Sequence, residues 1–352
     1  MSILDFYASP EKREELKALL ILAGQKHPDG LAPNFLEKDI WVTEILRLLY
    51  DEKLLGDMSV AFKGGTALSK CWKVIERFSE DIDLSIHWAD LAEADDEVEA
   101  WEKSVQSGSQ QQKFRKKQQA RLMAWSASLV EKLNERFAQY GIDELKAELD
   151  EDSKGEKVNV HFPRVTANDS DYQLDYVLLE FGGRNRGRPT KFHEVGCYLS
   201  EVDELSAISC PEANVQAYDA DYILWEKLTA LHQFSTQERE PSFNRLARHW
   251  YDVDCLLQAQ FADPLVSEQA MHDVVEMKSY RWAEKGVDYN LASSGGIKLI
   301  PDADRLEGIA KDHQDAVDGG MFFSVPDDFV MIIERIRKTQ DEINTSRQIK
   351  NK

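Results

Sequence analysis

The sequence predicts an α/β (α+β) fold with a mixed sheet, followed by a helical C-terminal part. Residues 58–86 contain two short strand patterns separated by a glycine pair and a helical stretch, an order typical of an α/β layer. Beyond about residue 215, apolar residues recur with helical spacing instead. Because domains hold roughly 100–200 residues each, the 352 residues predict two domains, 1–215 and 216–352.

Two helices are expected before the first strand, over residues 10–25 and 33–51. Residues 58–63 are typical of a short strand, which Gly64-Gly65 ends, because paired glycines favour a turn. A helix follows, with apolar residues at positions 68, 71, 72 and 75. The alternation of polar and apolar residues in Asp81–Ile86 then predicts a second strand.

Beyond residue 91, the same patterns predict one long helix, two more strands and then a series of helices. Residues 91–141 have a charged helical pattern, and two further strands are expected near 157–162 and 172–181. A basic, glycine-rich turn covers residues 182–191. The helices expected in the C-terminal part cover residues 219–234, 243–258, 265–284, 303–314 and 327–346.

Composition excludes several classes of protein. A formal net charge of −21 argues against non-specific coating of nucleic acid, so a nucleic-acid substrate must meet a local basic patch. No apolar stretch of about 18 residues predicts a membrane span, and the N-terminus lacks a secretion signal. The four cysteines are widely spaced, which argues against a structural zinc site and a disulfide framework. We expect a cytoplasmic protein.

One glycine turn and one carboxylate pair carry the chemistry. Gly64 and Gly65 let the backbone approach an anion closely, and Thr66 suits the N-cap of the next helix, whose N–H groups favour phosphate. Asp81 and Asp83 share one side of their strand, where two carboxylates repel unless a cation lies between them. Mg²⁺ (or Mn²⁺) prefers such oxygens together with substrate phosphates. The pattern therefore predicts a metal site facing a triphosphate.

The same motifs carry a family resemblance. Phe62–Lys70, followed by Arg77–Leu84, resembles the nucleotidyl transferase AbiEii/AbiGii toxin family. The resemblance extends to further segments, namely Glu37–Leu46, Glu226–Leu231, Arg248–Leu256 and the region from Lys311 to Asn344. It implies a DNA polymerase β-like nucleotidyltransferase domain and a bacterial toxin of an abortive-infection or type IV toxin–antitoxin system, with a separately encoded antitoxin. It also implies an NTP substrate and an RNA acceptor, with tRNA ends as the leading expectation.

Within this resemblance, Gly64, Gly65 and Thr66 match the motif that holds the nucleotide phosphates, and Asp81 and Asp83 match the metal ligands.

Lys227 and Asp252 match later positions implicated in activity, Lys227 also in nucleotide binding. Each also has an ordinary explanation. Lys227 can extend its ammonium from an apolar helix into water, and Asp252 can pair with Arg248 one helical turn earlier. His249 stands where the family often has Asp, so we assign it no role.

A polymerase β-like site has a third carboxylate on a neighbouring strand. Glu180 is the first choice, because it ends the apolar strand 172–181, where a carboxylate without a partner is costly. Asp175 is the alternative and would lie on the opposite face. Glu180 could also simply face water at the strand end.

The basic turn stands out in an acidic chain. Arg184, Arg186 and Arg188, with Lys191, directly follow the Glu180 strand, so we expect them beside the active centre, where they would bind the acceptor. The alternative is a solvated loop. A second basic run, Lys113–Lys117, is expected to be mostly solvated.

The sequence therefore predicts in-line attack of an acceptor hydroxyl on the α-phosphate of an NTP, with release of pyrophosphate. Two other classes remain open. The chain could transfer a nucleotide to a protein, including its own Ser79, or it could be a non-catalytic nucleotide-binding module. The intact carboxylate pair argues against the second, since binding alone does not need it.

Overall fold

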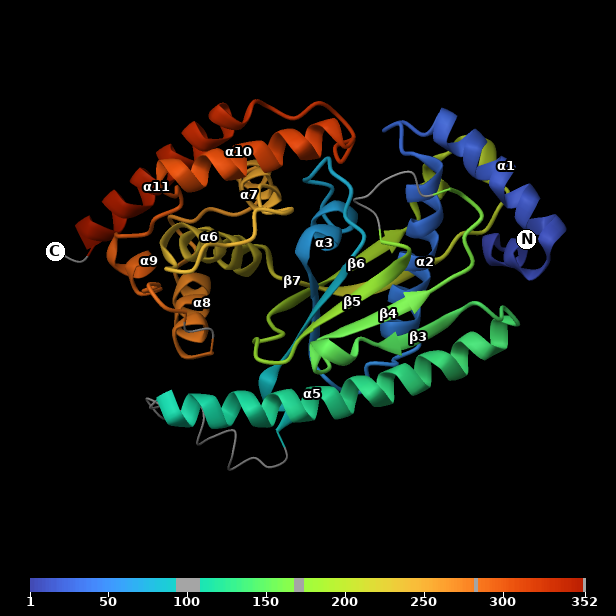
Figure 1. The fold of residues 1–352 in the computed structure, drawn as a ribbon, viewed down its shortest axis with the longest axis horizontal. Helices are drawn as coiled ribbons and strands as arrows, with labels where there is room; N and C mark the ends of the chain where they lie inside the picture. Colours follow the sequence, from blue (N-terminus) through green and yellow to red (C-terminus); the bar gives the residue numbers. More distant parts are fainter. Residues whose placement is uncertain (93–107, 168–173, 282–283, 351–352) are drawn as a thin grey trace. The chain divides into compact units, whose positions relative to one another are not determined.

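The computed structural model describes residues 1–92, 108–167, 174–281 and 284–350, and Figure 1 shows the fold as a ribbon. The chain divides into two units. The first holds Met1–Lys73 and Phe78–Tyr218, and the second holds Val74–Arg77 and Asp219–Lys352. The first unit thus ends at Tyr218, whereas we expected a boundary at residue 215 and no short excursion into the second unit.

A mixed sheet organises the first unit. In the described part of this unit, seven strands follow the order β3-β4-β5-β2-β1-β7-β6. The β2–β5 and β1–β7 pairs are parallel, and the other neighbouring pairs are antiparallel. The strands are β1 (Val60–Lys63), β2 (Ile82–Ile86), β3 (Lys146–Leu149), β4 (Lys157–His161), β5 (Tyr176–Gly182), β6 (Thr190–Gly196) and β7 (Glu212–Tyr218). The mixed α/β class is confirmed.

Sequence patterns located β1, β2, β4 and β5 but not the other strands. β6 was missed because most of its side chains are exposed or half-exposed, so apolar residues do not alternate with polar ones. β7 does alternate between buried and exposed side chains, yet it lies where we expected the change to helices. β3 has only four residues, too few for a clear period.

Helices surround this sheet, and one of them is buried on nearly all sides. The described helices of the first unit include α1 (Pro10–Lys26), α2 (Pro33–Tyr50), α3 (Gly64–Lys70) and α5 (Gly108–Phe137). Most side chains of α2 are buried, charged ones included, which explains its loose helical period in sequence. α3 ends earlier than expected, and Lys73 just beyond it has a positive φ of 52°, which a helix does not allow.

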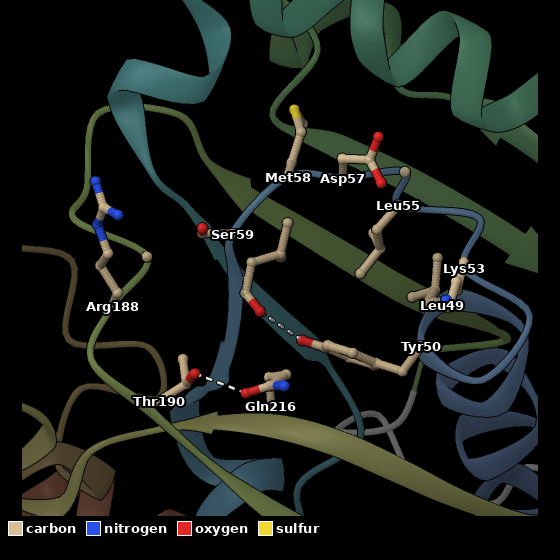
Figure 2. A pocket seen from close by; sticks show the side chains of 13 residues that line it. Leu49, Tyr50, Lys53, Leu55, Asp57, Met58, Ser59, Arg188, Thr190 and Gln216 are labelled. Carbon is tan, nitrogen blue, oxygen red and sulfur yellow. Dashed lines mark hydrogen bonds between the residues drawn. The ribbon is translucent and has the colours of Figure 1, made fainter.

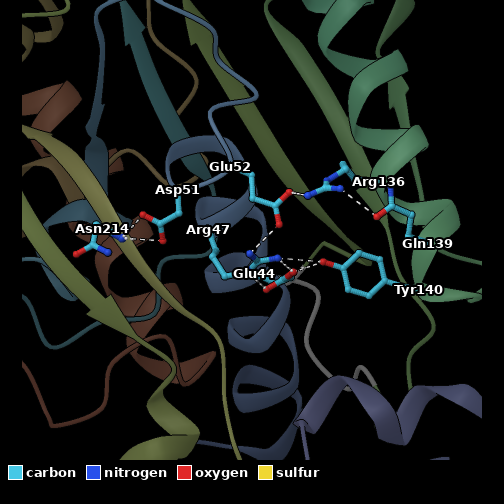
Figure 3. Close-up of polar contacts among 8 residues, drawn as sticks. All are labelled: Glu44, Arg47, Asp51, Glu52, Arg136, Gln139, Tyr140 and Asn214. Atoms are coloured by element: carbon cyan, nitrogen blue, oxygen red, sulfur yellow. Dashed lines mark hydrogen bonds and ion pairs between the residues drawn. The ribbon is translucent and has the colours of Figure 1, made fainter.

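The long helix α5 runs beside β3, as Figure 1 shows. The side chain of Asn134 exchanges two hydrogen bonds with the backbone of Ala147 on β3. Charged residues join the ends of α2 and α5 (Figure 3): Arg47 binds Glu44 and Glu52, and Glu52 also pairs with Arg136. Part of the helix expected over 91–141 lies outside the described residues.

The second unit is helical, as expected. Its described helices are α6 (Ala220–Thr236), α7 (Arg248–Gln258), α8 (Glu268–Arg281), α9 (Leu291–Ser294), α10 (Ala303–Asp318) and α11 (Phe329–Lys350). α7 begins later than the expected residue 243, because Arg245 has a positive φ of 59° that interrupts a helix. Among the described residues, no helix combines the length and the apolar character needed to cross a bilayer.

Candidate active site

Gly64 leaves no room for a side chain beside Asp83. Lys63 pairs with Asp83 across the antiparallel strands β1 and β2, which brings Gly64, the next residue, under the Asp83 side chain. A Cβ atom built on Gly64 would lie 1.8 Å from Oδ2 of Asp83. Gly64 also has a φ of +77°, which side chains disfavour. The position therefore requires glycine for two separate reasons.

Strand register brings Glu180 beside Asp83. β2 and β5 run parallel, with Asp83 opposite Glu180, so the two side chains share one face of the sheet. Both residues are half-buried, as is Asp81, while Ile82 and Leu84 between and beside the aspartates are buried. Carboxylates grouped in this way are hard oxygen donors that suit Mg²⁺ or Mn²⁺. The donor chemistry of these residues thus suits a divalent cation, while their ligand atoms do not all lie within 4.8 Å of one another in the described part of the chain.

The alternative third carboxylate lies elsewhere. Asp175 precedes β5, its side chain is largely exposed, and it binds Arg164 at 2.5 Å. It lies five positions before Glu180, which is about 16 Å along an extended strand. Of the two candidates, the structure brings only Glu180 next to Asp83.

Lys157 forms an ion pair with one of these carboxylates, Glu180. Nζ of Lys157, on β4, lies 2.9 Å from Oε1 of Glu180. The pKa of Lys157 is raised, mainly by its hydrogen bond to Glu180, and the charge of Asp81 adds to the effect. Lys157 therefore partly neutralises the carboxylates when no cation is bound, and sequence inspection did not identify it.

Thr66 lies deeper than its motif suggests. Its side chain is fully buried, and its hydroxyl donates a hydrogen bond of 3.0 Å to Oγ of Ser79. The threonine thus ties the start of α3 to the segment before the aspartates. A phosphate at this turn would meet backbone N–H groups rather than the Thr66 hydroxyl.

A buried ion pair supports the residue before Asp81. Nζ of Lys38, on α2, lies 2.8 Å from Oε2 of Glu80, and both side chains are almost fully buried. Glu80 also accepts a hydrogen bond from the backbone N–H of Leu174 at 3.0 Å. The pair therefore fixes the chain directly before Asp81. Sequence inspection did not identify this pair.

The second unit contains a separate buried charge cluster. The guanidinium of Arg77 donates two hydrogen bonds to the carboxylate of Asp252, at 2.7 and 2.8 Å. Nζ of Lys227 donates a third to Asp252, at 2.6 Å. The pair expected between Arg248 and Asp252 is therefore not what holds this carboxylate. Arg77 was part of a recognised motif, but sequence gave no reason to pair it with residue 252.

The charges in this cluster compensate one another. Burial alone would raise the pKa of Asp252, but the charges of Arg77 and Lys227 outweigh it and hold that pKa well below its usual range. Burial lowers the pKa of His249 well below its usual value, and the charges of Lys227 and Arg248 lower it further. His249 is therefore neutral at pH 7. The ammonium of Lys227 keeps some contact with solvent, since its side chain is 13% exposed.

The basic turn does not form one cluster. Arg184 lies 4.0 Å from Glu156, whereas a guanidinium nitrogen of Arg188 lies 2.5 Å from Nε2 of His87. Nδ1 of His87 binds the carbonyl of Arg186, so Nδ1 carries the proton and Nε2 accepts from Arg188. His87 follows the end of β2 that is distant from Asp81. The contacts of Arg184 and Arg188 thus go to different partners, Glu156 and His87, so the structure does not show one continuous basic cluster, and an acceptor-binding role for these arginines stays a prediction.

Arg188 also lines a hollow of about 530 Å³ at this far end (Figure 2). Tyr50, Lys53 and Gln216 contribute to the same wall. The hydroxyl of Tyr50 donates to the carbonyl of Val60 within it. Its lining contains none of the predicted metal ligands.

One group of described residues has ligand atoms close enough together to hold a cation. Among the described residues, ligand atoms of His27, Asp29 and Glu201 all lie within 4.8 Å of one another. However, the backbone N–H of Asp29 donates to Nδ1 of His27 at 3.1 Å. In a neutral imidazole, Nε2 must then carry the proton and has no lone pair for a metal. We therefore assign no metal to this group.

One family model matches most of the chain. The model of the nucleotidyl transferase AbiEii toxin, of the type IV toxin–antitoxin system, matches residues 47–335. No curated protein matches the chain. Among solved structures, the chain is similar to MenT4, a nucleotidyltransferase toxin from Mycobacterium tuberculosis H37Rv, with 15% identity and a TM-score of 0.46. That match covers 94% of this chain and 99% of the other.

Proposed function

The chain belongs to the nucleotidyl transferase AbiEii toxin family of type IV toxin–antitoxin systems, and from this premise we propose that it transfers a nucleotide from an NTP to RNA with the help of Mg²⁺. As a member of this family it is a nucleotidyltransferase. The observation that supports the proposed site most directly is the position of Asp83, between Gly64 on one side and Glu180 on the other.

In this proposal, Asp81, Asp83 and Glu180 hold the divalent cation. When bound, the cation neutralises charge on the phosphates and polarises the reacting oxygens. The residues of the chain position the reactants for in-line displacement. The acceptor hydroxyl attacks the α-phosphorus, the bond to the β-phosphate oxygen breaks, and pyrophosphate leaves. Lys157 shares Glu180 with the cation and limits repulsion among the carboxylates.

Lys227 is proposed to bind the nucleotide phosphates, and Asp252 to orient it. The carboxylate of Asp252 is fully buried and bound by Arg77 from one side, so it cannot itself reach a substrate easily. It holds the ammonium of Lys227, whose remaining N–H groups can donate to an anion. Asp252 is therefore a positioning residue in this proposal rather than a catalytic one.

RNA, with tRNA ends foremost, is proposed as the acceptor, and a separately encoded antitoxin as the partner that restrains the enzyme. Both follow from the family. A cytoplasmic location, where NTPs and tRNA are found, also stays a prediction. At a net charge of −21, RNA binding must rest on a local basic surface.

Protein nucleotidylation is the other candidate, including self-modification of Ser79. The geometry gives this residue little support as an acceptor, because the Ser79 hydroxyl accepts the hydrogen bond of the buried Thr66.

Label transfer decides between these acceptors. Purified protein is incubated with each labelled NTP, Mg²⁺ and total RNA in the presence of unrelated protein, and the labelled macromolecule is identified. Label in RNA with one preferred NTP supports the proposal. If only protein became labelled, the acceptor would be protein rather than RNA. If no macromolecule became labelled with any NTP, nucleotide transfer itself would be contradicted.

A further inference from the structure

Two cysteines of the first unit lie just beyond the last residue pair of strands β6 and β7. These strands run antiparallel, and Gly196 at the end of β6 pairs with Glu212 at the start of β7. Cys197 follows Gly196 directly, and Cys210 comes two residues before Glu212. The sulfur of Cys197 lies 3.4 Å from the carbonyl oxygen of Pro211, which follows Cys210 in the chain. The two segments that carry the cysteines are therefore adjacent.

The two thiols also interact directly. Both cysteines are free, and their side chains share a hydrogen bond, which shows that the two sulfurs point toward each other. One more residue pair of the β6–β7 ladder would place the Cα atoms of Cys197 and Cys210 about 6 Å apart. A disulfide joins Cα atoms that are about 4.4–6.8 Å apart. The pair therefore meets the geometric requirement for a disulfide.

Hydrogen bonds hold the backbone next to each cysteine. The N–H of Tyr198 donates to Oδ2 of Asp39 at 2.7 Å, which fixes the residue after the first cysteine. Ser209, the residue before the second cysteine, makes two backbone hydrogen bonds with residues 1–3, at 2.8 and 3.1 Å. The two sulfurs are thus kept side by side by their surroundings, and no large movement of the chain is needed to join them.

The four thiols of the chain differ in how readily they ionise. The hydrogen bond with Cys197 lowers the pKa of the half-buried Cys210 thiol. Burial raises the pKa of Cys197 well above its usual value. Burial also raises the pKa of Cys71 and that of Cys255, each to about 12. Because the thiolate is the form that reacts with peroxides, Cys210 is the thiol best suited to react first.

We propose that Cys197 and Cys210 form a modification site at which hydrogen peroxide produces a reversible disulfide. The Cys210 thiolate attacks one peroxide oxygen, the O–O bond breaks, and hydroxide leaves. The Cys197 sulfur then attacks the sulfur of the resulting sulfenic acid, the S–O bond breaks, and the thiol proton leaves with the hydroxyl group as water. Two thiols thus lose two electrons to one peroxide, and a thiol reductant reverses the change. Nucleotide transfer takes no part in this reaction, which is therefore independent of the proposed function.

Non-reducing peptide mapping of the full chain tests the site. Fully reduced wild-type protein is treated with a small excess of hydrogen peroxide, its remaining thiols are alkylated, and mass spectrometry identifies the linked peptides. Digestion after glutamate separates the two cysteines, because Glu201 and Glu204 lie between them. One linked pair, Cys197 with Cys210, should dominate, and dithiothreitol should restore both thiols. Protein that is unfolded in denaturant before oxidation should lose this selectivity.

Single variants establish the order of the two steps. In Cys197→Ser, Cys210 should stop at the sulfenic acid, which a dimedone probe labels. In Cys210→Ser, Cys197 should stay reduced at the same dose of peroxide. Cys71→Ser and Cys255→Ser are the matched controls, because each removes a thiol of raised pKa, and both should form the disulfide at the wild-type rate. The mapping of wild-type protein needs no variant, so it decides the question even where a variant fails to fold.

Several results would overturn the proposal. One is a dominant disulfide that contains Cys71 or Cys255 or that links two molecules. Another is oxidation of Cys210 to the sulfinic acid while Cys197 stays reduced, because the two sulfurs would then not react with each other. A third is the absence of any disulfide in folded protein, or an equal yield of the Cys197–Cys210 disulfide in folded and unfolded protein, since the fold would then not prearrange the pair.

Discussion

The carboxylate of Asp83 lies against the backbone of Gly64, so close that even a methyl group on the glycine would collide with it. The contact links the glycine turn to the carboxylate pair, two motifs that are separated in the sequence. Because Asp83 also lies opposite Glu180 in the sheet, one side chain connects the proposed phosphate turn with the proposed metal site.

Gly64→Ala should therefore abolish transfer, because the new Cβ must displace the Asp83 carboxylate. Gly56→Ala is a matched control, since Gly56 has a similar φ of +72° but open space where a Cβ would lie. Both variants should lose about 1–2 kcal/mol of unfolding free energy from backbone strain, and Gly64→Ala should lose more, because its Cβ also collides with Asp83. Only Gly64→Ala should also lose activity, measured as label transfer at saturating NTP. Equal activities in the two variants would show that the contact with Asp83 does not matter.

Asp252→Asn should destabilise the protein by about 3–5 kcal/mol, because it removes the buried carboxylate charge that Arg77 and Lys227 both bind. Arg248→Gln should cost clearly less than Asp252→Asn, since the hydrogen bonds to Asp252 come from Arg77 and Lys227. Denaturant unfolding of both variants measures the difference. If Arg248→Gln cost as much as Asp252→Asn, the intrahelical pair would be the dominant one after all.

The loss of unfolding free energy caused by Asp252→Asn should become smaller at acidic pH. The folded pKa of Asp252 is lowered, so its ionised form contributes stability above the unfolded pKa of about 3.9, and this contribution fades as pH falls towards the folded value. The difference in stability between wild type and variant should thus be constant at neutral pH and shrink below about pH 4. A difference that grew on acidification would contradict the charge assignment.

Lys227→Met should preserve the fold but weaken nucleotide binding. Arg77 keeps both of its hydrogen bonds to Asp252 in this variant, so the buried carboxylate stays paired. Loss of one charge-assisted hydrogen bond to a phosphate should raise the dissociation constant for NTP about 10-fold or more. Calorimetry with a non-hydrolysable NTP analogue measures it. Unchanged affinity with lost stability would make Lys227 a purely structural partner of Asp252.

Local patterns in the sequence were sufficient for the central motif. The strand, glycine turn, helix and second strand around Gly64 and Asp83 depend on neighbouring residues, so their order could be read directly. The sequence already favoured Glu180 over Asp175, but its position opposite Asp83 depends on the strand register, which joins residues almost a hundred positions apart. The partners of Asp252, Arg77 and Lys227, also lie on distant segments. Residue spacing along the chain cannot predict contacts of this kind. From the sequence, the available partner for Asp252 was Arg248, one helical turn away, and the arginines of residues 184–188 were expected to form one cluster.

The most direct test of the account compares Asp83→Asn with Asp175→Asn in label transfer to RNA. Both changes replace a carboxylate by an amide of similar volume, and only Asp83 belongs to the proposed metal site. The account predicts that Asp83→Asn, folded as judged by its melting curve, loses transfer in Mg²⁺ and in Mn²⁺. Asp175→Asn should transfer label at the wild-type rate, and excess chelator should stop it. Equal rates in the two variants, or full activity of wild type in chelator, would contradict the metal-dependent site at Asp83.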